Sequence, residues 1–86
     1  MAFVLTERFR RAYRSLTAEE QKRVQNALRR MSEDLRHPGL RIKRVRGRQS
    51  IWEVRASRAL WLTFEVEGDK IVLRIVGSHA ATSKRP

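Results

Sequence analysis

The sequence contains no cysteine and only two histidines among its 86 residues. Without cysteine, disulfides, a thiolate nucleophile and thiolate-ligated zinc are all excluded, and the chain suits a reducing cytosol. Two histidines cannot hold zinc by themselves, because such sites use about four ligands. We therefore expect no metal and no cofactor.

A long apolar run is also missing. No stretch approaches the roughly 20 apolar residues that span a bilayer. The first residues, MAFVLTERF, have neither the basic region nor the long apolar region of a signal peptide. These absences predict a cytoplasmic protein that is not inserted in a membrane. The length predicts a single domain over residues 1–86.

Acidic residues are scarce. There are 9 Asp and Glu against 20 Lys and Arg, which gives a formal net charge of +11. A small domain stays soluble with a charge magnitude of about 2 to 8, so the excess favours a polyanionic partner such as nucleic acid, an acidic protein or an anionic membrane. A solvated basic surface is the alternative. The charge is concentrated, since residues 36–58 hold eight Lys and Arg and a single acid, Glu53.

Two amphipathic helices are predicted after a short strand, AFVLT. Thr6 can cap the first helix, and Thr17 with Glu20 forms a capping box that starts the second helix at residue 18. The second helix ends at HPGL, where proline cannot continue it. The apolar stripes are Phe9, Ala12, Tyr13 and Leu16 in the first helix, and Val24, Ala27, Leu28, Met31 and Leu35 in the second.

After residue 39 the apolar period changes from 3.6 to 2, which is typical of strands. The predicted strands are LRIKRV, SIWEVRA, LWLTFEVE and KIVLRIVG, and the last three form an antiparallel meander. In the last strand, Leu73 and Ile75 are expected on one face, and Arg74 and Val76 on the other. The final residues, ATSKRP, are predicted to be a frayed tail.

These elements predict an α+β fold. An N-terminal helix hairpin packs on one face of a twisted, mainly antiparallel sheet of four to five strands. The helices are expected on the apolar face of the sheet. The opposite face collects a mixed polar set: Glu53, Arg55, Trp61, Thr63, Glu65 and Arg74.

Several segments in this order resemble the RelE/ParE toxin superfamily of bacterial toxin–antitoxin systems. They are HPGL, the basic hairpin that ends in IWEVR, and WLTFEVEGDKIVLRIVGSHA, and together they cover nearly the whole chain. The stretch LWLTFEVEGDKIVLRIVGSHAA is most similar to the YafQ-like branch. The resemblance implies a RelE-like fold and a type II toxin, a ribosome-dependent mRNA interferase that cleaves mRNA without a metal. The implied partners are the ribosome, mRNA and a cognate acidic antitoxin.

The resemblance also implies site residues. His79 falls on the C-terminal catalytic histidine, and Trp61 on a tryptophan that begins a strand. His37 lies near a histidine that precedes the basic hairpin. Arg55 stands where relatives hold arginine or histidine, and Arg74 matches an arginine with a slip of one residue.

Two departures from the pattern keep other functions open. Leu60 stands where the YafQ-like pattern has an aspartate, and AATSKRP lacks the terminal aromatic residue of many nucleases of the family. A catalytically degenerate, basic RNA-binding relative is therefore one alternative. A ParE-like inhibitor of DNA gyrase is another, since it uses the same scaffold and needs no catalytic histidine.

Metal-free RNA cleavage needs a base near the 2′-hydroxyl, cations for the phosphate and an acid for the leaving oxygen. His79, Arg55 and Arg74 can supply these roles, whereas His37 can instead interact with the last carbonyls of a helix. Trp61 can stack on a base, or shield arginine stems, while Trp52 is expected in the core. The residues expected to contact RNA phosphates are Lys43, Arg44, Arg46, Arg48 and Arg58.

Overall fold

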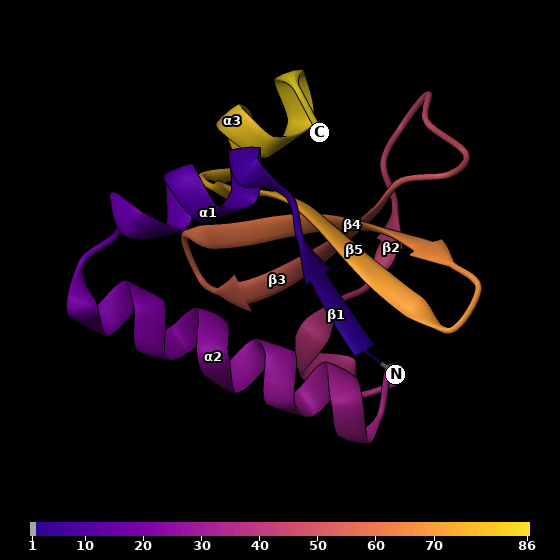
Figure 1. Cartoon of the computed structure of the whole chain (residues 1–86), viewed down its shortest axis with the longest axis horizontal. Coiled ribbons are helices and arrows are strands. Elements are labelled where there is room, and N and C mark those ends of the chain that lie inside the picture. Colours follow the sequence, from indigo (N-terminus) through magenta and orange to yellow (C-terminus); the bar gives the residue numbers. More distant parts are fainter. Residues whose placement is uncertain (1) are drawn as a thin grey trace.

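The computed structural model describes residues 2–86, and it has the predicted α+β architecture (Figure 1). A short 3₁₀ turn, η1, follows the second helix, and a third helix follows the last strand. The elements in chain order are β1 (Ala2–Leu5), α1 (Glu7–Arg14), α2 (Ala18–Glu33), η1 (Pro38–Leu40), β2 (Lys43–Arg44), β3 (Trp52–Ser57), β4 (Leu60–Glu67), β5 (Lys70–Gly77) and α3 (His79–Lys84).

The five strands form one sheet in the order β1-β5-β4-β3-β2. Strands β2 to β5 pair antiparallel, so the predicted meander of the last three strands is confirmed. Strand β1 pairs parallel with β5 at the other edge, with Ala2 opposite Lys70. The sheet is therefore mainly antiparallel, as the alternating pattern predicts.

Both predicted helix starts are confirmed. The Thr6 side chain accepts a hydrogen bond from the Phe9 amide at 3.1 Å. Thr17 and Glu20 form a reciprocal capping box with hydrogen bonds of 2.9 and 3.1 Å. These caps satisfy amide groups that the first turn of a helix leaves without partners.

The core lies between the two N-terminal helices and one face of the sheet. Helix α1 packs against β5, and α2 packs against β3. Phe9 of α1 and Val24 of α2 are fully enclosed beside Leu62 of β4 and Leu73 of β5. The stripes read from the sequence thus face the sheet, and burial of this apolar area is the main stabilising term.

The segment after α2 differs from the prediction. Helix α2 ends at Glu33, earlier than HPGL, and residues 38–40 form η1. Arg41 then adopts a left-handed conformation with φ of 49°. Because a left-handed residue interrupts an extended chain, the predicted strand LRIKRV is reduced to Lys43–Arg44.

A bulge in β5 also overturns a prediction. Thr63 pairs with Ile75 and Phe64 pairs with Leu73, which leaves Arg74 as the extra residue. After an extra residue the alternation of faces reverses. Val76 is therefore in the core, whereas the prediction placed Ile75 on the core face and Val76 with Arg74.

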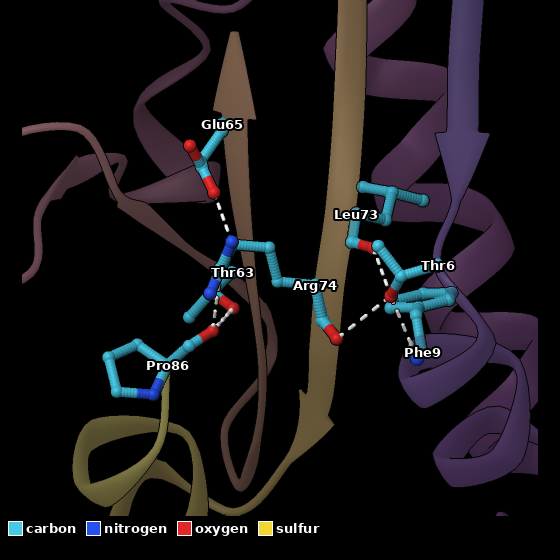
Figure 2. A network of polar contacts seen from close by, with 7 residues as sticks. All are labelled: Thr6, Phe9, Thr63, Glu65, Leu73, Arg74 and Pro86. Carbon is cyan, nitrogen blue, oxygen red and sulfur yellow. Dashed lines mark hydrogen bonds and ion pairs between the residues drawn. The ribbon is translucent and has the colours of Figure 1, made fainter.

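The structure of the C-terminal residues differs most from the prediction. The predicted frayed tail instead forms α3, which packs on β4 and β5. Ser78 caps this helix, and Thr82 is fully buried. The Pro86 carbonyl oxygen accepts hydrogen bonds from Thr63 Oγ1 at 2.8 Å and from Arg74 Nε at 3.1 Å (Figure 2). The polar face of the sheet is therefore partly covered, and Thr63 is 0% exposed.

No helix within residues 2–86 is both long enough and apolar enough to cross a membrane.

Candidate active site

An enclosed carboxylate lies at the centre of the polar face. Glu53 of β3 pairs with Lys43 of β2 and Thr63 of β4, and the residue is only 5% exposed. One carboxylate oxygen lies 3.1 Å from Nε2 of His79, and the other lies 3.5 Å from Nζ of Lys43. An enclosed carboxylate without partners would be costly, so these two contacts explain how the charge is accommodated.

His79 is the first residue of α3, and it sits where β5 ends. Ser78 caps the helix and so orients the turn that carries the imidazole. The ring lies 4.6 Å from the indole of Trp61, tilted by 45°. The side chain of His79 is 51% exposed, so one side of the ring is open to a ligand.

The register of the sheet aligns the groups around His79. Trp61 of β4 is the direct partner of Arg55 in β3 and of Gly77 in β5. The guanidinium carbon of Arg55 lies 5.9 Å from the Trp61 ring, in reach of a cation–π interaction. The predicted grouping of Trp61 with Arg55 on the polar face is consistent with this contact.

The hydrogen bond to Glu53 fixes the tautomer of His79. A carboxylate can only accept, so Nε2 of the imidazole carries the proton in this pair. In the neutral ring Nδ1 then keeps a lone pair and can accept a proton from a ligand. The arrangement can therefore act as a general base at Nδ1.

A groove of about 330 Å³ opens beside this pair. Three cationic side chains of the predicted RNA-binding set belong to its lining: Lys43, Arg44 and Arg46. Glu53, His79 and Ser83 complete the polar part of the wall. The groove thus joins a proton acceptor to several positive charges, which suits an anionic substrate.

The other predicted RNA contacts lie further out. Arg48 lies in the loop of residues 45–51 and lines a second hollow together with Arg44 and Arg46. Arg44 also places its guanidinium carbon 4.8 Å above the Trp52 ring. Trp52 packs against the core, as predicted. Arg58 is exposed in the turn between β3 and β4, away from the lining of the groove.

Three predicted catalytic residues lie outside the lining of the groove. Arg55 lines another hollow together with Arg23 and Arg30 of α2. His37 caps η1, where Nδ1 accepts a hydrogen bond from the Gly39 amide at 3.1 Å. It therefore accepts from an amide and does not donate to helix carbonyls. Arg74 forms an ion pair with Glu65 and donates to the Pro86 carbonyl (Figure 2). It lines a separate pocket.

Sequence reasoning missed the role of Glu53. Its place on the polar face was predicted from the period of β3, but its contact with His79 joins two residues 26 positions apart. That contact depends on α3, which the sequence pattern did not predict. Within residues 2–86, no three His, Asp or Glu side chains are grouped so that they could hold a metal ion.

Comparison with known proteins agrees on the fold. The RelB-RelE antitoxin-toxin complex of Methanococcus jannaschii matches with a TM-score of 0.76 and 21% identity, covering 96% of this chain and 99% of the other. The YoeB/ParE toxin of Agrobacterium tumefaciens matches with a TM-score of 0.76 and 14% identity, covering 92% and 99%. The chain has the fold of the RelE/ParE-like toxins. No protein-family model and no curated protein sequence matches it.

The RelE/ParE-like fold does not single out one branch. Escherichia coli YafQ matches with a TM-score of 0.67 and 10% identity, covering 92% of this chain and 93% of that one. Both the TM-score and the identity are lower than those of the two structures above. The similarity to the YafQ-like branch therefore stays a prediction from the sequence.

Proposed function

We propose that this protein is the toxin of a type II toxin–antitoxin system, and that it cleaves mRNA on the ribosome without a metal. The observation that carries the proposal is the Glu53–His79 pair, held at 3.1 Å beside a cationic groove. A protein that only poisons a partner by binding has no need of an imidazole held in one tautomer. The likeness of fold to known toxins supports the toxin role.

The pair supplies the base for attack by the 2′-hydroxyl of RNA. Nδ1 of His79 accepts the hydroxyl proton, and Glu53 stabilises the imidazolium that forms. The 2′-oxygen then attacks the adjacent phosphorus, and the 5′-oxygen leaves with a proton from water in the open groove. The products are a cyclic 2′,3′-phosphate and a 5′-hydroxyl.

The cations beside the pair stabilise the negative charge that develops on the phosphate. Lys43, Arg44 and Arg46 line the groove and are the nearest candidates for this role. The Trp61 ring packs against the imidazole of His79, and it offers a surface on which a nucleotide base can stack. Arg55 is near Trp61 but outside the groove lining, so its contribution is the cation–π contact with the Trp61 ring.

A cognate antitoxin completes the proposal. A net charge of +11 favours an acidic partner, because complementary charges speed association and select the partner. The solved structures with this fold include a RelB-RelE antitoxin-toxin complex, in which an antitoxin is bound.

The test is brief induction of the chain in bacteria, followed by mapping of new mRNA 5′ ends and by a plasmid supercoiling assay. We expect new 5′-hydroxyl ends within translated regions and unchanged supercoiling. Loss of supercoiling with intact mRNA would replace the proposal with a gyrase inhibitor. Arrest of translation with intact mRNA would replace it with a basic RNA-binding relative.

A further inference from the structure

Another concave surface, of about 200 Å³, is distinct from both the Glu53–His79 groove and the hollow lined by Arg44, Arg46 and Arg48. Five basic residues from separate parts of the chain line it: Arg8 of α1, Arg48 of the 45–51 loop, Arg74 of β5, Lys84 of α3 and Arg85. Ile51 and Pro86 complete the lining. We call this surface the basic pocket. In Figure 1 the start of α1, the C-terminal end of α3 and the 45–51 loop all lie along the upper part of the molecule.

The basic pocket carries an excess of positive charge. Glu65 pairs with Arg74, but within residues 2–86 no acidic side chain forms an ion pair with any of the other four. Burial, followed by the charges of Arg85 and Arg74, lowers the pKa of Arg8. The cations are therefore close enough to repel one another, and a bound anion would offset this repulsion.

Hydrogen bonds to backbone carbonyls hold two of these guanidinium groups in place. Arg8 donates to the Arg85 carbonyl. Figure 2 shows the other hydrogen bond, in which Nε of Arg74 donates to the Pro86 carbonyl at 3.1 Å. The hydrogen bond to Arg85 fixes Arg8 without pairing it with an acidic side chain, whereas Arg74 is also paired with Glu65. Arginine forks held in this way are suited to the oxygens of a phosphate, which they bind through paired N–H donors.

The basic pocket is connected to the groove through the 45–51 loop. Arg48 lines both the basic pocket and the hollow that it shares with Arg44 and Arg46. Arg44 and Arg46 in turn line the groove beside His79. Shared cationic lining residues thus connect the groove beside His79 with the basic pocket, and a strand that carries a phosphate on every nucleotide can contact both.

We propose that the basic pocket binds a backbone phosphate of the RNA strand whose scissile phosphate occupies the Glu53–His79 groove. The inference rests on the proposed function for the position of the scissile phosphate. The pocket holds the strand through its charge and reads no base, so it positions RNA without sequence preference.

The test uses a 12-nucleotide single-stranded RNA and the His79→Ala chain, so that binding is measured without cleavage. Affinity is measured by fluorescence anisotropy over a range of salt concentrations. The variant is Arg8→Gln with Arg85→Gln. The control is Arg11→Gln with Arg29→Gln, which removes the same charge from exposed positions of α1 and α2.

Each phosphate bound on a single strand contributes about 0.7 to the slope of log affinity against log salt. We expect the slope of the pocket variant to be lower than that of the control by about this amount, and we expect Arg8→Lys with Arg85→Lys to restore it. If circular dichroism shows that the pocket variant is unfolded, Arg85→Gln alone replaces it, since Arg85 is exposed beyond α3. Equal slopes for the variant and the control overturn the inference.

Inorganic phosphate separates a free-anion site from a strand site. Saturable shifts of the Arg8 and Arg85 side-chain signals with phosphate, together with equal RNA slopes, would mean a free-anion site and would also overturn the inference. The proposed function fails independently. If wild-type chain leaves mRNA intact on ribosomes while the RNA slopes differ as expected, the pocket stands and the cleavage proposal falls.

Discussion

At the scale of single residues, the acidic side chain that lines the groove is Glu53, and it is enclosed. Glu53 holds His79 on one oxygen and Lys43 on the other. The pair depends on this geometry because the carboxylate can only accept, so the proton of the hydrogen bond belongs to Nε2 of His79. A base that is fixed in one tautomer needs no rearrangement when substrate arrives.

Replacing the two histidines separately tests which one is the base. We expect His79→Ala to reduce mRNA cleavage by about 10² to 10⁴, the usual contribution of general acid–base catalysis. The fold should survive, because the side chain is half exposed and Glu53 keeps its contact with Lys43. His37→Ala is the matched control. It removes only the cap of η1, so cleavage should be unchanged and thermal stability slightly lower.

Equal cleavage by both histidine variants, with normal far-UV circular dichroism, would remove His79 from the mechanism.

Glu53→Ala tests the positioning role of the carboxylate. We expect a smaller reduction of cleavage than for His79→Ala, because the base remains but its tautomer is no longer fixed. Nitrogen-15 chemical shifts of the imidazole should change from one tautomer to a mixture. Glu65→Ala is the control, since it removes another acid of the same face that contacts Arg74. An unchanged tautomer in Glu53→Ala would contradict the assignment.

At the scale of elements, helix starts were predictable because caps are local. Thr6, Thr17 and Glu20 lie within three residues of the amides that they satisfy. The β5 bulge and α3 were not predictable, because both depend on interactions between distant parts of the chain. Thr82 is buried without belonging to any apolar stripe, and Thr63 reaches Pro86 from 23 residues away.

The same limit applies to the site. The period of the strands correctly put Glu53, Arg55 and Trp61 on one face, because alternation is a property of each strand alone. The contact of Glu53 with His79 could not be read from the sequence, since His79 begins α3. The segment ATSKRP has no apolar stripe that would predict a helix there. Arg74 was assigned to the same site, yet its ion pair with Glu65 holds it in the basic pocket.

The attachment of α3 gives a prediction at this scale. Thr63→Val keeps the shape of the buried side chain but removes the hydrogen bond to Pro86, which should lower the free energy of unfolding by about 1 kcal/mol. Amide hydrogen exchange should become faster in residues 79–84. Cleavage should fall as well, because α3 begins at His79.

Thr63→Ser keeps the hydroxyl and serves as the control for this variant. Equal exchange rates in the Val and Ser variants would show that the hydrogen bond does not hold α3.

At the scale of the whole molecule, the positive charge is distributed over more surface than the groove requires. Exposed Lys and Arg occupy the outer sides of α1 and α2 as well as the 45–51 loop. Within residues 2–86, the Lys and Arg that line the groove beside the Glu53–His79 pair come from β2 and the 45–51 loop. Position and not total charge should therefore decide which cations contact the ribosome.

A fourfold substitution tests this expectation. Changing Lys43, Arg44, Arg46 and Arg48 to glutamine should flatten the salt dependence of ribosome affinity, because each phosphate that is no longer bound lowers the log–log slope by about 0.7 to 0.9. The site of cleavage should not move. The control changes four exposed cations of the helical side: Arg11, Lys22, Arg29 and Arg36. Parallel slopes for the two variants would show that residues 43–48 are only a solvated surface.

The bulge at Arg74 affects how this chain should be aligned with its structural relatives. Before the bulge, every second residue of β5, such as Ile71 and Leu73, faces the helices. After the bulge this series continues on the opposite face, and Val76 is the residue that faces the helices. A sequence alignment anchored at His79 therefore assigns the residues before Arg74 to the wrong face, unless it includes a one-residue gap at the bulge. Equivalent positions in this strand are better assigned by their hydrogen-bonded neighbours in β4 than by distance along the chain. A single insertion or deletion here can leave His79 in place while exchanging which side chain enters the basic pocket.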